Sequence, residues 1–182
     1  MEYERRPLHM VDMFFFPIMV DGMYHAVTID TKRERIFVLD SMLDVGTADE
    51  IQKYDDLCSM LRRLLADYLS YEREEQKAKI VSKTKIHLLR LKWADRMNKE
   101  DTGVYMMRHL ETFMGDCSAS WKCMSALSRT RQLRVMRVRY CATLIAWERN
   151  EIGGMLGLTA ADHYKEICKD ENLNINLTLI GS

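Results

Sequence analysis

Three short apolar runs separated by tight turns occupy the first forty residues, and they restrict the fold more than any other feature. The runs lie at 13–18, 23–30 and 35–40, and each has the length and the aromatic and β-branched content of a strand. Asp21-Gly22 and the polar residues 31–34 are turn signals. Connections this short join antiparallel neighbours, and continuous apolar runs indicate burial on both faces. We therefore expect an antiparallel meander covered on both faces.

Helical patterns follow these strands. Residues 47–50 form a capping box, in which threonine and glutamate side chains satisfy free amides at a helix start. The helix that it opens carries an apolar stripe at helical spacing: Ile51, Tyr54, Cys58, Leu61, Leu65 and Tyr68.

The remaining elements complete an α+β fold. The charged run at 72–85 is expected to be a surface connection, and 86–93 a further strand. Helices are expected at 103–114, ended by Gly115, at 125–149 with Leu133, Met136, Tyr140, Leu144 and Trp147 as its buried stripe, and at 160–169. The predicted fold class is α+β, a small, mostly antiparallel sheet flanked by helices.

Composition and charge narrow the class of protein. A chain of 182 residues fits a single domain over 1–182 that ends in a polar tail at 171–182. Lys+Arg and Asp+Glu are equal at 27 each, so no overall attraction to nucleic acid or membrane is expected. Five cysteines without a CxxC pair predict reduced thiols. The apolar run at 13–20 is too short for a signal peptide or a membrane span. We expect an intracellular protein of the nucleus or cytoplasm, not a secreted one.

Four short segments follow one another in a recognisable order: Phe-Phe-Pro-Ile at 15–18, Tyr-His-Ala-Val at 24–27, Ile-Phe-Val-Leu-Asp-Ser at 36–41 and Asn-Lys-Glu-Asp-Thr-Gly-Val-Tyr at 98–105. In order and spacing they resemble the ubiquitin-like-protein-specific (desumoylating) cysteine proteases, in the divergent form common in plant genomes and their transposons. The resemblance covers roughly residues 10–150. It implies a trimmed papain-like fold in which His25 and Asp40 hold triad positions.

Departures from the family pattern decide the expected activity. Thr102 stands at the position of the nucleophilic cysteine, and Arg96 at that of the oxyanion-hole glutamine. A thiol with a pKa of about 8.5 can ionise beside an imidazole, whereas a threonine hydroxyl has no comparable ionised form. Ala26 replaces the tryptophan that shields the histidine, and little of the family's N-terminal lobe precedes residue 13. We therefore expect no enzyme but a pseudoprotease, in which His25, Asp40, Thr102 and Arg96 are vestigial.

The expected function is binding to another protein. A ubiquitin-like modifier is the partner that the resemblance implies, and an unrelated partner or self-association is the alternative, through apolar surface at Phe14, Phe15 and Phe16. A toxin or antidote role fits the transposon-linked lineage.

Two rivals come from other classes. One is an active peptidase that uses Thr102 or, from the later Asp-Cys pair, Cys117. The other is a nucleic-acid binder whose basic helix includes Arg131, Arg134 and Arg137. The zero net charge favours the alternative that these arginines form a solvent-exposed helix face without a binding role. His87 and His109 have no second ligand at helical or strand spacing, so we expect no metal and no cofactor.

Overall fold

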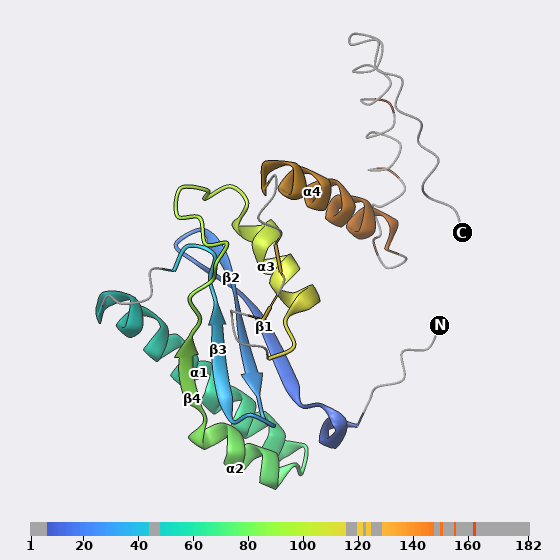
Figure 1. The fold of residues 1–182 in the computed structure, drawn as a ribbon. Helices are drawn as coiled ribbons and strands as arrows, with labels where there is room; N and C mark the ends of the chain where they lie inside the picture. The colour runs from blue at the N-terminus through green and yellow to red at the C-terminus, as the bar shows by residue number, and fades with distance from the viewer. Residues whose placement is uncertain are drawn as a thin grey trace. The chain divides into compact units, whose positions relative to one another are not determined.

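The computed structural model describes residues 7–43, 48–115, 120–121, 123–124, 129–147, 150, 155 and 162 (Figure 1). The chain divides into two compact units, Met1–Leu133 and Arg134–Ser182. The expectation of a single domain over 1–182 remains a prediction. The capping threonine at 47, the helix expected at 160–169 and the tail at 171–182 lie outside the described residues. None of the helices in the described ranges is long and apolar enough to cross a bilayer.

The first unit contains a four-stranded sheet in the order β1-β2-β3-β4. β1 (Met13–Val20), β2 (Met23–Asp30) and β3 (Arg35–Leu39) form the antiparallel meander that the apolar runs predict. β4 (Lys85–Leu88) is shorter than expected and pairs with β3 in parallel. The sheet is therefore mixed but mostly antiparallel, and the α+β class is confirmed.

Helices lie on both faces of this sheet (Figure 1). Alternate side chains of β2 and β3, such as Val27 and Val38, pack with α1 (Ala48–Tyr71) and α2 (Glu75–Lys83) in one apolar cluster. The intervening side chains lie on the opposite face, where Phe37 meets Phe113 just after α3 (Thr102–Thr112), with ring centroids 5.2 Å apart. The expectation of burial on both faces therefore holds for β2 and β3.

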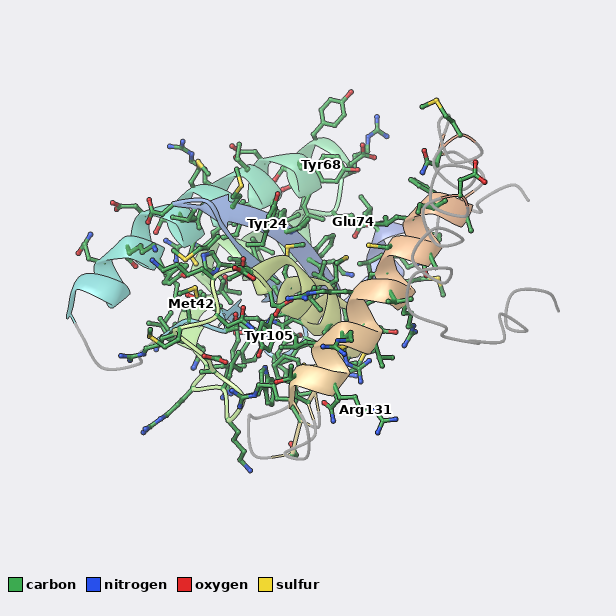
Figure 2. The ribbon with its side chains drawn as sticks, turned by 90° about the horizontal axis from the view of Figure 1, so that it is seen from above. Tyr24, Met42, Tyr68, Glu74, Tyr105 and Arg131 are labelled. Carbon is green, nitrogen blue, oxygen red and sulfur yellow. The ribbon has the colours of Figure 1, made fainter. Side chains whose placement is uncertain are left out.

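α1 and α2 correct two expectations. The α1 stripe is buried at Tyr54, Cys58, Leu61 and Leu65, but its next buried residue is Leu69, while Tyr68 is 49% exposed on the outer side of the helix (Figure 2). The predicted stripe alternates steps of three and four residues, which is a shorter repeat than the 3.6 residues of a helical turn, so the stripe drifts and the step after Leu65 is four residues, to Leu69. The charged run at 72–85 is not a plain connection, because it forms α2, which buries Ala78 and Val81 three residues apart.

β1 is an edge strand with Pro17 in its middle, paired opposite Ala26. Proline lacks an amide hydrogen and is tolerated in a sheet only where no ladder bond is needed, as on an edge. Phe14 and Phe16 are partly buried and pack against the apolar cluster beneath α1, while Phe15, also partly buried, falls on the opposite face by strand alternation. The three phenylalanines therefore do not form one exposed patch.

α4 (Arg129–Ala146) is the basic helix. Leu133 is buried in it, whereas Leu144 and Trp147 are 55% and 52% exposed. The buried stripe expected along this helix is therefore wrong at its C-terminal end. Arg131, Arg134 and Arg137 are exposed. Their proposed role in binding remains a prediction.

Gly115 and Gly22 offer a matched test of backbone geometry, because both have positive φ, +80° and +76°. A Cβ on Gly115 would lie 2.9 Å from Asp30 Oδ2 and 2.7 Å from Arg33 Cζ, whereas one on Gly22 would meet nothing within 4 Å. We expect Gly115→Ala to lower the free energy of unfolding by about 3 kcal/mol, from strain and collision together, and Gly22→Ala by about 1 kcal/mol. Urea unfolding measures both values. Equal losses of unfolding free energy in the two variants would show that the Asp30 and Arg33 side chains move away from the new methyl group without destabilising the fold.

Candidate active site

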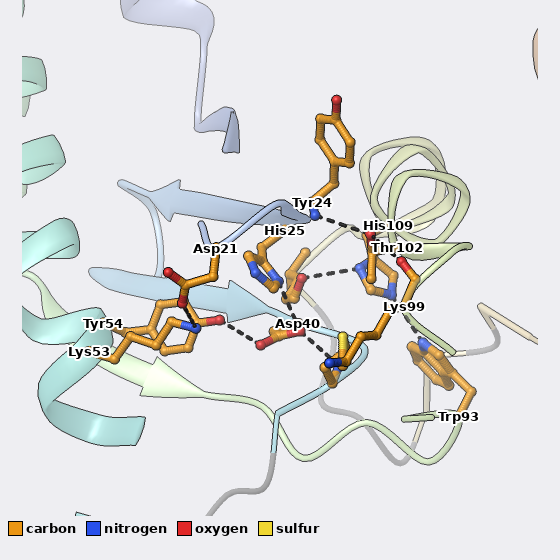
Figure 3. Close-up of polar contacts among 12 residues, drawn as sticks. Asp21, Tyr24, His25, Asp40, Lys53, Tyr54, Trp93, Lys99, Thr102 and His109 are labelled. Carbon is orange, nitrogen blue, oxygen red and sulfur yellow. Dashed lines mark hydrogen bonds and ion pairs between the residues drawn. The ribbon is translucent and has the colours of Figure 1, made fainter. Parts of the chain in front are cut away.

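His25 and Asp40 meet at one end of the sheet. Ala26 of β2 pairs with Leu39 of β3, so the preceding residue on one strand and the following residue on the other are neighbours. His25 Nδ1 lies 2.9 Å from Asp40 Oδ1, and both side chains are almost fully buried (Figure 3). Among the residues that the structure describes, neither ring nitrogen of His25 has an aligned hydrogen-bond partner. The contact with Asp40 is therefore electrostatic, and no described group is bonded to Nε2.

Two further groups hold the Asp40 carboxylate. Tyr54 on α1 donates its hydroxyl to Oδ2 at 2.5 Å, and the Met42 amide donates to Oδ1 at 2.7 Å. Burial alone raises the pKa of Asp40, but the contacts with His25, Tyr54 and the Met42 amide outweigh it, so the pKa lies below its ordinary value. Asp40 is therefore an anion at neutral pH, suited to orient an imidazole and stabilise its positive form.

Thr102 is the first residue of α3 and is 2% exposed. Its Oγ1 accepts a hydrogen bond from the Tyr24 amide at 3.2 Å and donates to the Lys99 carbonyl at 3.3 Å. The hydroxyl is thus bound to the residue that precedes His25, at a helix N-terminus whose amide dipoles favour negative charge (Figure 3). Its proton points to the Lys99 carbonyl rather than to His25, whose Nε2 has no partner within the described part of the chain.

The turn before α3 is shaped by two side chains of the Asn-x-x-Asp motif. Asn98 Oδ1 accepts from the Asp101 amide at 3.0 Å, and Asn98 Nδ2 donates to Asp101 Oδ2 at 2.8 Å. This reciprocal pair closes the turn and sets the first residue of the helix. The same loop lines an open pocket of about 580 Å³: Asp95, Met97, Asn98, Lys99, Glu100 and Asp101.

Behind the site, His109 of α3 is fully buried and bonded at both ring nitrogens. The Trp93 indole donates to Nε2 at 3.0 Å, and Nδ1 lies 3.3 Å from the Leu39 carbonyl. Burial lowers the pKa of His109 to about 4, although the bond to Leu39 opposes the shift. The ring is therefore neutral at pH 7.

The other predicted positions are distributed as follows. Arg96 is exposed in the loop between β4 and α3, and Ala26 is fully buried. Cys117 lies outside the described residues. Burial raises the pKa of Cys58 to about 12 and that of Cys123 to about 11, so neither thiol is poised as a nucleophile. Within the described ranges, no group of three His, Cys, Asp or Glu side chains could hold a metal ion.

Sequence patterns missed Tyr54 and His109. The sequence pattern predicts Tyr54 only as a member of the apolar stripe, and it gives His109 only as a histidine without a second metal ligand. A tyrosine on the buried face of a helix is a weak signal, because a buried hydroxyl needs a partner. Nothing in the sequence could reveal that this partner is Asp40.

A family model described as the Ulp1 protease family, C-terminal catalytic domain, matches residues 2–132. No curated protein and no solved structure matches. The match includes Thr102 as well as His25 and Asp40, and it ends before the part of α4 that follows residue 132. It contradicts the expectation that the chain is not an enzyme, because the matching family consists of proteases. The absence of a thiol at position 102 is not in itself the absence of a nucleophile, since a hydroxyl activated by a histidine base can also attack.

Proposed function

Because this chain belongs to the Ulp1 protease family, we propose that it is a peptidase of ubiquitin-like modifiers in which Thr102 supplies the nucleophile. His25 acts as the general base, and Asp40 orients it. Its expected place of action is inside the cell, in the nucleus or cytoplasm, where such modifiers occur. Self-association, and the plant and transposon lineage, remain predictions.

One observation carries this proposal: in the buried His25–Asp40 pair no described group is bonded to Nε2, and the Thr102 hydroxyl, bound to the neighbouring Tyr24 amide, stands at the start of α3. A buried imidazole nitrogen without a partner is costly in a structural role, since most buried polar atoms are bonded. A general base needs a ring nitrogen that can accept the proton of the nucleophile, and His25 Nε2 meets this requirement.

The proposed chemistry needs one rearrangement of the Thr102 side chain. The Thr102 side chain turns from the Lys99 carbonyl toward His25, and the Oγ1 proton passes to Nε2 as Oγ1 attacks the carbonyl carbon of the modifier's C-terminal residue. The resulting oxyanion lies near the N-terminal amides of α3, whose dipoles stabilise it. The imidazolium returns its proton to the departing amine, which leaves an ester on Thr102. Water hydrolyses that ester with His25 again as the base.

A modifier tail can reach this site along the loop before α3. The pocket lined by residues 95 and 97–101 is open and ends at the residue before Thr102. An extended tail needs little volume, and an open groove admits one attached to a folded modifier. This argument supports the substrate class but does not identify which modifier is cleaved.

Hydrolysis of ubiquitin-like precursors tests the proposal. Thr102→Val keeps the shape and removes the hydroxyl, so we expect it to reduce cleavage at least about a hundredfold, as should His25→Ala. Thr102→Ser keeps the hydroxyl and should retain activity. Wild-type protein that cleaves no precursor above background, or Thr102→Val protein that cleaves as fast as wild type, would refute the assignment.

A further inference from the structure

His109 occupies a place in the core that an apolar side chain could fill without desolvation. It is fully buried, and its ring neighbours are aromatic: Trp93, Tyr105 and Trp121. Burying an imidazole costs free energy unless its nitrogens are bonded. Both are bonded here, to groups from two other parts of the chain.

These partners determine where the ring proton lies. The Trp93 indole is only a donor, so it requires a bare Nε2. The single proton of the neutral ring is then on Nδ1, and it is donated to the Leu39 carbonyl. Protonation of Nε2 would place two donors against each other. His109 is therefore fixed as one tautomer by geometry alone.

The bond to Leu39 reaches the end of β3 from outside the sheet. The β3–β4 ladder ends at Val38, one residue earlier, and Asp40 lies beyond the last pair with β2. The nearby groups whose charge acts on the His109 ring are Asp40 and His25. The ring thus connects α3, which begins with Thr102, to the residue before the catalytic carboxylate (Figure 3).

We propose that His109 is a positioning residue, which holds the Leu39 carbonyl and thereby fixes Asp40 against His25. The purpose of this clamp rests on the proposed function, but its test does not need peptidase activity. Asp40 Oδ1 accepts from the Met42 amide at 2.7 Å, so displacement of Asp40 exposes that amide to exchange with solvent.

Three substitutions separate the two bonds of His109. An asparagine amide can stand near Nδ1 and donate to Leu39, but it does not reach Trp93. A glutamine can accept from Trp93 near Nε2 and lose the Leu39 bond. His109→Phe keeps a ring and loses both. The clamp predicts that Asn rescues Asp40 and that Gln does not.

Hydrogen exchange of the Met42 amide, measured by NMR relative to amides of the β1–β2 ladder, decides the matter. We expect His109→Gln and His109→Phe to accelerate it about tenfold or more, and His109→Asn by less than about threefold. Should the Phe variant fail to fold, the Asn and Gln pair still decides. Equal exchange in these two variants, or a wild-type His109 ring protonated on Nε2 in long-range ¹H–¹⁵N spectra, overturns the proposal. Wild-type protein without peptidase activity would overturn the proposed function and leave this pattern unchanged.

Discussion

Replacing Thr102 with cysteine should increase labelling by a ubiquitin-like vinyl-sulfone probe at least about a hundredfold over wild type. A thiol at the first turn of α3, near His25, ionises far more readily than a hydroxyl and attacks without complete proton removal in the transition state. Thr102 already occupies the helix start with its side chain buried at the site. Turnover of a precursor should rise less than labelling, because the sequence resemblance predicts the charged Arg96 at the position of the family's neutral oxyanion donor.

The control for this experiment is the double variant Thr102→Cys with His25→Ala. If the thiolate depends on the imidazole, the double variant should lose most of the gained labelling. Cys58 and Cys123 are buried, with pKa values raised to about 12 and about 11, so they should contribute little background. Labelling of Thr102→Cys at the wild-type rate would mean that position 102 does not face the bound tail.

Lowering the pH from 6.5 to 4 should cost the fold about 3 kcal/mol through His109 alone. The pKa of this ring falls from 6.5 to about 4 on folding, chiefly because of burial. Between these values the unfolded chain binds more protons than the folded one, so stability declines as pH falls. The loss begins below 6.5 and is complete near 4. Asp40, whose pKa is also lowered, loses its contribution only below its ordinary value of 3.8.

Urea unfolding at several pH values, compared between wild type and His109→Gln, isolates this contribution. Glutamine does not titrate, so the variant should show a flatter profile between pH 6.5 and 4. His87→Gln is a matched control, because His87 is only partly buried, and burial with nearby Arg35 and Lys85 lowers its pKa in the same direction. That variant should keep most of the wild-type slope. Parallel slopes in wild type and His109→Gln would contradict the expected coupling.

The sequence predicts the part of the site that depends on local order. Short turns bring β2 and β3 side by side, which places His25 and Asp40 at the same sheet end. The Asn-x-x-Asp motif and the apolar spacing after it predict a helix that begins near Thr102. Each of these inferences needs only neighbours along the chain or across one hairpin.

The contacts that sequence reasoning missed are formed by residues that lie far apart along the chain. Tyr54 reaches Asp40 from another helix, and Trp93 and Leu39 meet His109 across 16 and 70 positions of the chain. The periodicity of apolar residues gives no information about such contacts. α2 was missed for a different reason. Most of its residues are charged or polar, so the segment as a whole is hydrophilic although Ala78 and Val81 are buried. The parallel pairing of β4 likewise depends on the helices that carry the chain across the sheet.

Pro17 has a consequence for the newborn chain. β1 is synthesised before its hairpin partner β2, and its three consecutive phenylalanines give it the apolar character of an aggregation-prone strand while it is unpaired. Fibril growth requires an uninterrupted row of amide donors along a strand, and Pro17 breaks that row near its centre. Before β2 pairs with β1, the amide hydrogen that Pro17 lacks limits how many backbone hydrogen bonds the β1 strands of two chains can form with each other. A proline that the edge strand tolerates is therefore also expected to lower the tendency of β1 to pair with β1 of another chain.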